Sequence, residues 1–302
     1  MDEVTRAFYE MAFKVAYVEK KSDEFQDFFS SIMEKRYPAD FVRVRPWGRL
    51  GDRKNDGYLR SRRILFQCYA PNELESSRCV AKIDEDFTGA LPHWQEHFRT
   101  WVFVHNSRAG LGPDVVQKLL ELGKRHDQLV ITHWGFEELR QEAMGLAEPE
   151  LASLLGPAPS RHGMAALGLK DLAPILDQVA RLAPTPDPDL RPVPADKLQR
   201  NLLSSAVGSL LKAGMSRADL VRKYFKLRPT LQDQIAESFR SQYVDLQKAG
   251  TSPDDIFTAL QRFAGGDIVR SAGVQNAVFA VLAFFFEECD IFERPEPGTE
   301  AP

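Results

Sequence analysis

Two short apolar segments joined by an amphipathic stretch constrain the fold of this chain most. The segments TWVFVHN (100–106) and QLVITHW (128–134) are rich in β-branched and aromatic residues, as buried strands are. Residues 112–125, between them, have the pattern and length of a helix. Strands connected through a helix form a βαβ unit, so we expect a parallel pair with both faces of the sheet covered.

The residues before this unit predict the rest of an α/β layer. EFQDFFSSIMEKR (24–36) places its large apolar side chains on one helical face, and FVRVRPW (41–47) alternates as a strand does. A turn then leads to a second strand, ILFQCYA (64–70). A helix follows at about 76–97, which Pro92 kinks or shortens. We therefore expect a mixed sheet, partly antiparallel, flanked by helices.

A proline-rich segment marks the clearest boundary in the chain. LAPTPDPDLRPVPADK (182–197) holds five prolines and few residues that could be buried, which is typical of an extended linker. All of the later segments have helical periodicity. We expect an α/β domain over residues 1–182, a linker over 183–196 and an all-α helical bundle over 197–302.

Composition restricts the class of protein. Hydrophobic residues make up 43% and charged residues 27% of the 302 residues, as in a soluble globular protein. Cys68, Cys79 and Cys289 lack metal-ligand spacing and indicate reduced thiols of a cytoplasmic protein. No signal peptide is recognisable. The apolar run AVFAVLAFFF (277–286) is too short to cross a bilayer, so it forms the centre of the bundle or contacts a partner.

Positive charge is concentrated in one short region. The net charge is −4, so any nucleic-acid surface must be local. Eight cations lie between residues 43 and 63, around the acidic residues Asp52 and Asp56, and phosphate is the obvious counter-charge. The alternative is a solvated hairpin without a ligand. The predicted nucleic-acid-binding residues are Arg43, Arg45, Arg49, Arg53, Lys54, Arg60, Arg62 and Arg63.

Three motifs in this region match those of a known fold. The helix DEFQDFFSSIM (23–33) is followed by the turn GDRKNDG (51–57) and the strand FQCY (66–69), and then by the βαβ unit. This order resembles the restriction-endonuclease-like fold of the PD-(D/E)xK superfamily, most closely its Mrr-type branch. The resemblance covers roughly residues 20–145.

The resemblance implies a magnesium-dependent nuclease site. Asp56 would be the main Mg²⁺ ligand and Gln67 the second, and the metal would activate water for phosphodiester hydrolysis. The family has a lysine two residues after Gln67, where this chain has Tyr69. Strand alternation places Leu65, Gln67 and Tyr69 on one face. A phenol donates a hydrogen bond but supplies no fixed positive charge.

Three cations are candidates for the role of the missing lysine. Lys82, on the helix after the strand, is favoured because that helix packs against the strand. Lys54 could reach from the turn, and Arg63 is a poor base because arginine stays protonated. Glu24 could add a carboxylate, or could be an exposed residue at the start of its helix.

Two histidines lie where parallel strands end. His105 and His133 are near the carboxyl ends of their strands, the edge at which open α/β sheets place ligands. We favour a structural role for both.

A second resemblance concerns the chain as a whole. The GDxxNDGY…FQxYAP core and the CDIFERP ending are similar to bacterial defence proteins of multi-component operons, in particular three-component ABC-ATPase systems. The resemblance implies a helical C-terminal module that docks on partner subunits. Three functions stay open: a Mg²⁺-dependent DNA endonuclease, a non-catalytic nucleic-acid-binding module, and an assembly subunit.

Overall fold

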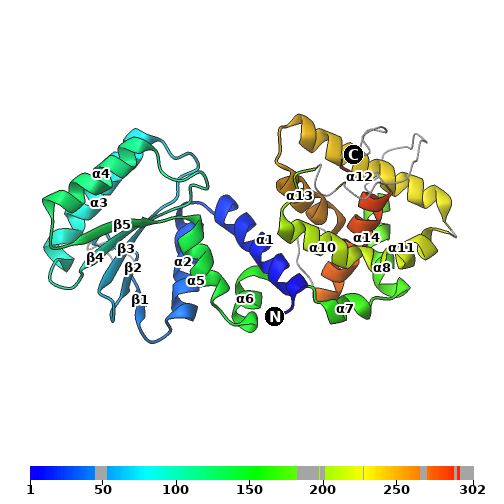
Figure 1. The fold of residues 1–302 in the computed structure, drawn as a ribbon, viewed down its shortest axis with the longest axis horizontal. Coiled ribbons are helices and arrows are strands. Elements are labelled where there is room, and N and C mark those ends of the chain that lie inside the picture. Colours follow the sequence, from blue (N-terminus) through cyan, green and yellow to red (C-terminus); the bar gives the residue numbers. More distant parts are fainter. Residues whose placement is uncertain are drawn as a thin grey trace, which may run out of the picture. The chain divides into compact units, whose positions relative to one another are not determined.

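The chain forms two compact units in the computed structural model. An α/β unit spans Ala12–Leu155, and a helical unit combines Met1–Met11 with Gly156–Pro302. Helix α1 (Glu3–Glu19) contributes to both units. Figure 1 shows the elements of each unit. The structure describes residues 1–44, 53–181, 197, 201–226, 228–265, 271–288 and 291–292.

A five-stranded mixed sheet is the centre of the α/β unit. Its strands follow the chain order across the sheet. The first strand pairs with the second, and the second with the third, in antiparallel orientation. The third pairs with the fourth, and the fourth with the fifth, in parallel orientation. The predicted mixed sheet and βαβ unit are therefore confirmed. The strands are β1 (Phe41–Arg43), β2 (Gly57–Leu59), β3 (Ile64–Tyr69), β4 (Thr100–His105) and β5 (Val130–Trp134).

Helices cover both faces of this sheet (Figure 1). On one face lie α3 (Ser76–Trp94) and α4 (Pro113–Arg125). On the other lie α2 (Ser22–Arg36) and α5 (Phe136–Met144), with α6 (Glu148–Leu155) beside α2. These positions agree with the expected βαβ geometry.

The side chains of β3 divide between the two cores, as alternation requires. Leu65 packs with Ile83 and Phe87 in the cluster under α3 and α4. Phe66 packs with Phe29 and Phe41 in the cluster under α2 and α5. This confirms the predicted placement of Leu65, which lies on the face of β3 that α3 covers.

The strand β2 was not predicted. It has only three residues and begins at Gly57, inside a segment whose composition is typical of a turn. A side chain at Gly57 would meet the Phe41 ring, since a Cβ there would lie 2.3 Å from Cζ. A glycine lets β1 and β2 pair beneath that ring.

The helical unit is built around α14 (Ala272–Glu287), whose residues from Gln275 to Phe286 are all buried. Of the two roles expected for this run, the structure assigns the centre of the bundle. No helix in the described residues is long and apolar enough to span a membrane. Around α14 lie α7 (Arg161–Ala165), α8 (Leu169–Arg181), α10 (Ser205–Met215), α11 (Ala218–Phe225), α12 (Pro229–Lys248) and α13 (Pro253–Gly265) (Figure 1).

The boundary between the units differs from the expected one at 182/183. Helix α8 precedes the proline-rich segment, yet it packs on α14 with Leu172 and Leu176 fully buried. The units therefore divide between Leu155 and Gly156. The linker expected over 183–196 lies outside the described residues.

Candidate functional site

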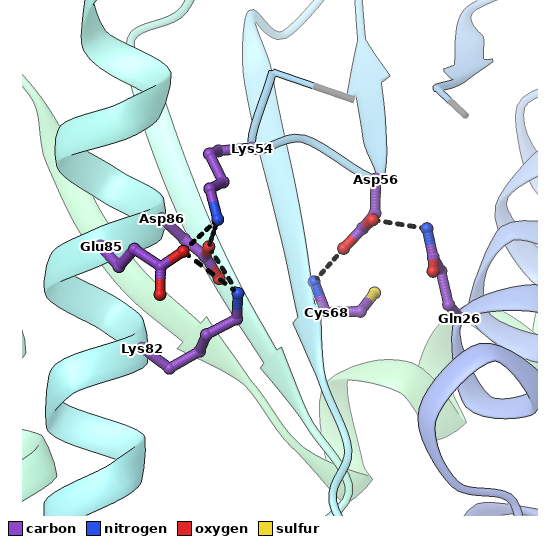
Figure 2. Close-up of polar contacts among 7 residues, drawn as sticks. All are labelled: Gln26, Lys54, Asp56, Cys68, Lys82, Glu85 and Asp86. Atoms are coloured by element: carbon purple, nitrogen blue, oxygen red, sulfur yellow. Dashed lines mark hydrogen bonds and ion pairs between the residues drawn. The ribbon is translucent and has the colours of Figure 1, made fainter. Parts of the chain in front are cut away.

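Asp56 lies immediately before β2 and is held against β3. Its backbone amide donates to the carbonyl of Phe66 at 2.9 Å. Its side chain is buried and accepts two hydrogen bonds, from the Cys68 amide at 2.6 Å and from Gln26 Nε2 of α2 at 2.5 Å. Figure 2 shows the carboxylate between these two donors. The carboxylate is thus fixed in position and already partly satisfied.

Gln67 lies on β3, one residue after Phe66, the register partner of Gly57. The register ends with Gly57 opposite Phe66, and the Asp56 amide donates to the Phe66 carbonyl as well, so Asp56 does not continue the regular pairing with Gln67. Gln67 is only 5% exposed, and its Oε1 has no hydrogen-bond partner among the described residues. A buried amide oxygen without a donor is unusual in a folded protein.

Tyr69 lies on the α3 face of β3, as predicted, and packs against the cluster that contains Leu65. It pairs in register with His105, and its ring is 6.1 Å from that of Phe103. Burial raises the pKa of Tyr69 above its usual value. The position of the missing lysine therefore holds a neutral phenol.

Lys82 and Lys54 meet at one buried carboxylate. Lys82 Nζ lies 2.9 Å and Lys54 Nζ 3.2 Å from Oδ1 of Asp86, which is fully buried. The Lys82 amine is therefore turned toward a buried residue and away from the outer face of α3. Figure 2 shows the two amines converging from the helix and from the turn. Both candidates for the lysine role are thus held by the same carboxylate, that of Asp86.

Asp86 was not predicted as a site residue. Burial raises its pKa, and the two lysines oppose that effect. Its Oδ2 has no hydrogen-bond partner among the described residues. Helical spacing could have identified it, because Cys79, Ile83 and Phe87 form the buried stripe of α3 and position 86 lies on that stripe.

Among the residues that the structure describes, the predicted cations form two groups and not a single surface around Asp56. Arg53 and Lys54 precede Asp56, whereas Arg60 and Arg62 lie in the turn at the opposite end of β2. The expectation that the whole run surrounds the carboxylates is therefore corrected, because a short strand separates two groups of cations. Arg45 and Arg49 lie outside the described residues.

Several of these cations have partners within the protein. Arg43 forms an ion pair with Asp27 of α2. The Arg62 guanidinium lies over the Tyr37 ring, 5.4 Å from its centroid. Arg63 donates to the carbonyl of His97 at 2.9 Å, beyond the end of α3. Arg60 donates to the Ala39 carbonyl.

Two of the remaining candidates lie away from Asp56 or are exposed. Arg63 precedes β3, at the end of the strand opposite to Tyr69, so it is poorly placed for the lysine role. Glu24 is exposed on the first turn of α2. We assign neither residue to the site.

His105 and His133 lie side by side, with ring centroids 5.5 Å apart. His105 is 1% exposed, and its Nδ1 accepts from the Ser107 amide at 3.2 Å. Burial, with a smaller contribution from His133, lowers the pKa of His105 to about 4. His105 is thus a neutral imidazole near pH 7, which agrees with the expected structural role.

The donor chemistry suits a hard cation better than a soft one. Within the described residues, no group of three or more His, Cys, Asp or Glu side chains is arranged to hold a metal. The Asp56 carboxylate and the unsatisfied Gln67 oxygen are both donors of the kind that Mg²⁺ prefers. They are not brought together in this structure, because the Asp56 carboxylate is held by Gln26 of α2, whereas Gln67 lies on the face of β3 that α3 covers.

One comparison with known proteins identified a related domain. Residues 170–293 match the family model for C-terminal domain 10 of the ABC-three component (ABC-3C) systems. The matched region lies within the helical unit. Neither the curated proteins nor the solved structures compared with the chain gave a match. The family match supports a component of a defence-related multi-protein system.

Proposed function

Because residues 170–293 match a C-terminal domain of the ABC-three component systems, we propose that the helical unit docks this chain onto other subunits of such a system. The buried state of α14 implies that docking uses the outer surfaces of the bundle. The α/β unit then remains as the part of the chain that acts on the target.

We propose that the α/β unit is a nuclease-like module that acts on DNA. The observations that carry this proposal are two buried oxygen donors of the β2–β3 hairpin, Asp56 immediately before β2 and Gln67 on β3. The Gln67 oxygen without a partner supports it, because an apolar core gives no reason to bury that group. The mixed order of the sheet agrees with the fold that the motifs resemble.

The residues of the chain have separate roles in this proposal. Asp56 and Gln67 would hold Mg²⁺, which supplies charge neutralisation at the phosphoryl oxygens and lowers the pKa of an attacking water. Lys82, anchored by Asp86, presents a cation to the phosphate. Tyr69, a neutral phenol, would donate a hydrogen bond to the substrate.

Substitution of Asp56 tests this activity. Asp56→Asn removes the charge but keeps an oxygen for the Cys68 amide, and the Gln26 amide can turn to accept from the new amino group. We expect wild type to cleave duplex DNA with Mg²⁺ and not with EDTA, and Asp56→Asn to bind DNA without cleavage. The matched control is Asp127→Asn, which removes the same charge from an exposed position of the same unit and should cleave normally.

The second candidate is a nucleic-acid-binding module without catalysis. Tyr69 at the lysine position favours it, as do the two hydrogen bonds that already occupy the Asp56 carboxylate. Wild-type protein that binds DNA but leaves it intact with Mg²⁺, alone and with the other subunits, would select this candidate. Absence of both binding and cleavage would contradict both candidates.

A further inference from the structure

The two lysines on Asp86 form an arrangement that a simple salt bridge does not explain. A single oxygen, Asp86 Oδ1, accepts from Lys82 at 2.9 Å and lies 3.2 Å from the Lys54 amine. The aspartate is fully buried, whereas the lysine side chains are 31% and 32% exposed. One buried anion thus holds two cations whose side chains are partly exposed to solvent.

The turn before β2 is built to bring Lys54 to this point. Arg53 and Lys54 both have positive φ, 53° and 60°, a conformation that non-glycine residues rarely adopt. The Lys54 stem then crosses α3 at Gly89, where a Cβ would lie 2.8 Å from Lys54 Cγ. The backbone strain and the glycine both serve to place this amine beside Asp86.

Glu85 forms an ion pair with Lys54 on the exposed side of this cluster. Its carboxylate pairs with Lys54 and lies 4.0 Å from Lys82 Nζ, and its side chain is 60% exposed. The hydrogen bond from Lys54 lowers the pKa of Glu85, so Glu85 is ionised when it makes this contact. An exposed ion pair contributes little to stability, whereas the contacts to the buried Asp86 are much harder to break.

We propose that Lys54 and Lys82, anchored by Asp86, form a binding site for a backbone phosphate of DNA, and that Glu85 occupies this site until the phosphate replaces it. A phosphodiester carries the same charge as Glu85 and offers oxygen acceptors to both ammonium groups. The Gln67 oxygen and Asp86 Oδ2 are both buried and have no partner among the described residues. Both lie on the α3 side of the sheet, so this side carries polar groups that are not satisfied within the part of the protein that the structure describes. The inference rests on the proposed function and specifies how its site contacts the DNA backbone.

The test is the affinity for a short labelled DNA duplex, measured by fluorescence anisotropy at low salt without Mg²⁺. Glu85→Gln removes the competing charge from an exposed side chain, so we expect the fold to be retained. We expect up to about fivefold tighter binding, the equivalent of one exposed ion pair. Lys54→Met and Lys82→Met should weaken binding, and each should lower the log–log salt slope by about 0.9.

The matched control is Glu121→Gln on α4, which removes the same charge from an exposed pair with Arg125. It corrects for the change in net charge of the protein. Equal affinity of Glu85→Gln and Glu121→Gln would overturn the inference, even if wild type binds DNA.

A second measurement separates this inference from the proposed function. If wild type does not bind DNA, the proposed function fails, and the site is then tested with inorganic phosphate by NMR of the lysine ammonium groups. A phosphate response at Lys54 and Lys82 that is stronger in Glu85→Gln would support the site. Wild type without such a response would overturn it.

Discussion

His105 illustrates how one buried side chain makes stability depend on pH. The imidazole is enclosed at the end of β4, next to His133 and Glu138, and the Ser107 amide donates to its Nδ1. Burial keeps it neutral in the folded protein, with a pKa of about 4 against an ordinary value of 6.5. The unfolded chain therefore binds a proton between these two values that the folded chain does not bind.

This difference predicts that the α/β unit loses stability as the pH falls from 6.5 toward 4. The loss should approach about 3 kcal/mol at the acid end, since each pKa unit corresponds to about 1.4 kcal/mol. His105→Asn, which keeps an acceptor near the Ser107 amide, should flatten this part of the stability profile measured by urea unfolding. The exposed His93→Asn is the control. An equal slope in wild type and His105→Asn would show that other groups cause the acid sensitivity.

Among the elements, α10 offers two glycines in contrasting surroundings. A Cβ at Gly214 would lie 2.2 Å from the Phe279 carbonyl oxygen and 2.7 Å from Ala283 Cβ of α14. At Gly208 nothing lies within 4 Å. The first glycine allows the two helices to approach closely, and the second has no such role.

We predict that Gly214→Ala destabilises the helical unit by about 1–3 kcal/mol, because neither backbone can move without disturbing the core. Gly208→Ala should be neutral or stabilising by up to about 1 kcal/mol, since alanine favours the helix. Chemical denaturation followed by circular dichroism measures both variants. Similar stability of the two variants would mean that α10 does not pack on α14 as closely as the structure indicates.

The sequence predicted those elements whose pattern is long and regular. The strands near 64–70 and 100–105 were found because apolar and β-branched residues continue through them. Strand β2 was missed because its three residues continue a polar turn, and its pairing depends on Gly57 meeting Phe41. Helix α8 was placed in the wrong unit, since its amphipathic pattern cannot show which core it packs against.

The candidate site was predicted only in part, for a related reason. Gln67 and Tyr69 lie on β3, so alternation was enough to place Tyr69 on the face that α3 covers. Asp56 precedes β2, and the contact of its carboxylate with Gln26 of α2 could not be read from the motif. Asp86 lies in the acidic stretch IDED, which indicates a solvated helix face until the neighbouring buried positions are considered. The contact of Lys54 with α3 depends on a turn conformation that no periodicity predicts.

For the whole molecule, charge and chemistry are distributed unevenly between the units. The net charge is −4, and the two groups of cations on the β2–β3 hairpin lie at opposite ends of a three-residue strand. Under the proposed function, this local positive charge would confine nucleic-acid contacts to the α/β unit. The family match lies entirely in the other unit. Assembly and action on DNA should therefore be separable by mutation.

The variants described above test this separation in one co-purification experiment. We predict that Asp56→Asn loses DNA cleavage but still co-purifies with the other subunits of the system at the wild-type level, because its substitution lies outside the matched region. Gly214→Ala should co-purify less well, because it perturbs the packing of α10 on α14 within that region, while Gly208→Ala should behave as wild type. Loss of partners by Asp56→Asn would place the docking surface on the α/β unit. Full retention by a destabilised Gly214→Ala would mean that the partners bind a part of the bundle that does not depend on the contact of α10 with α14.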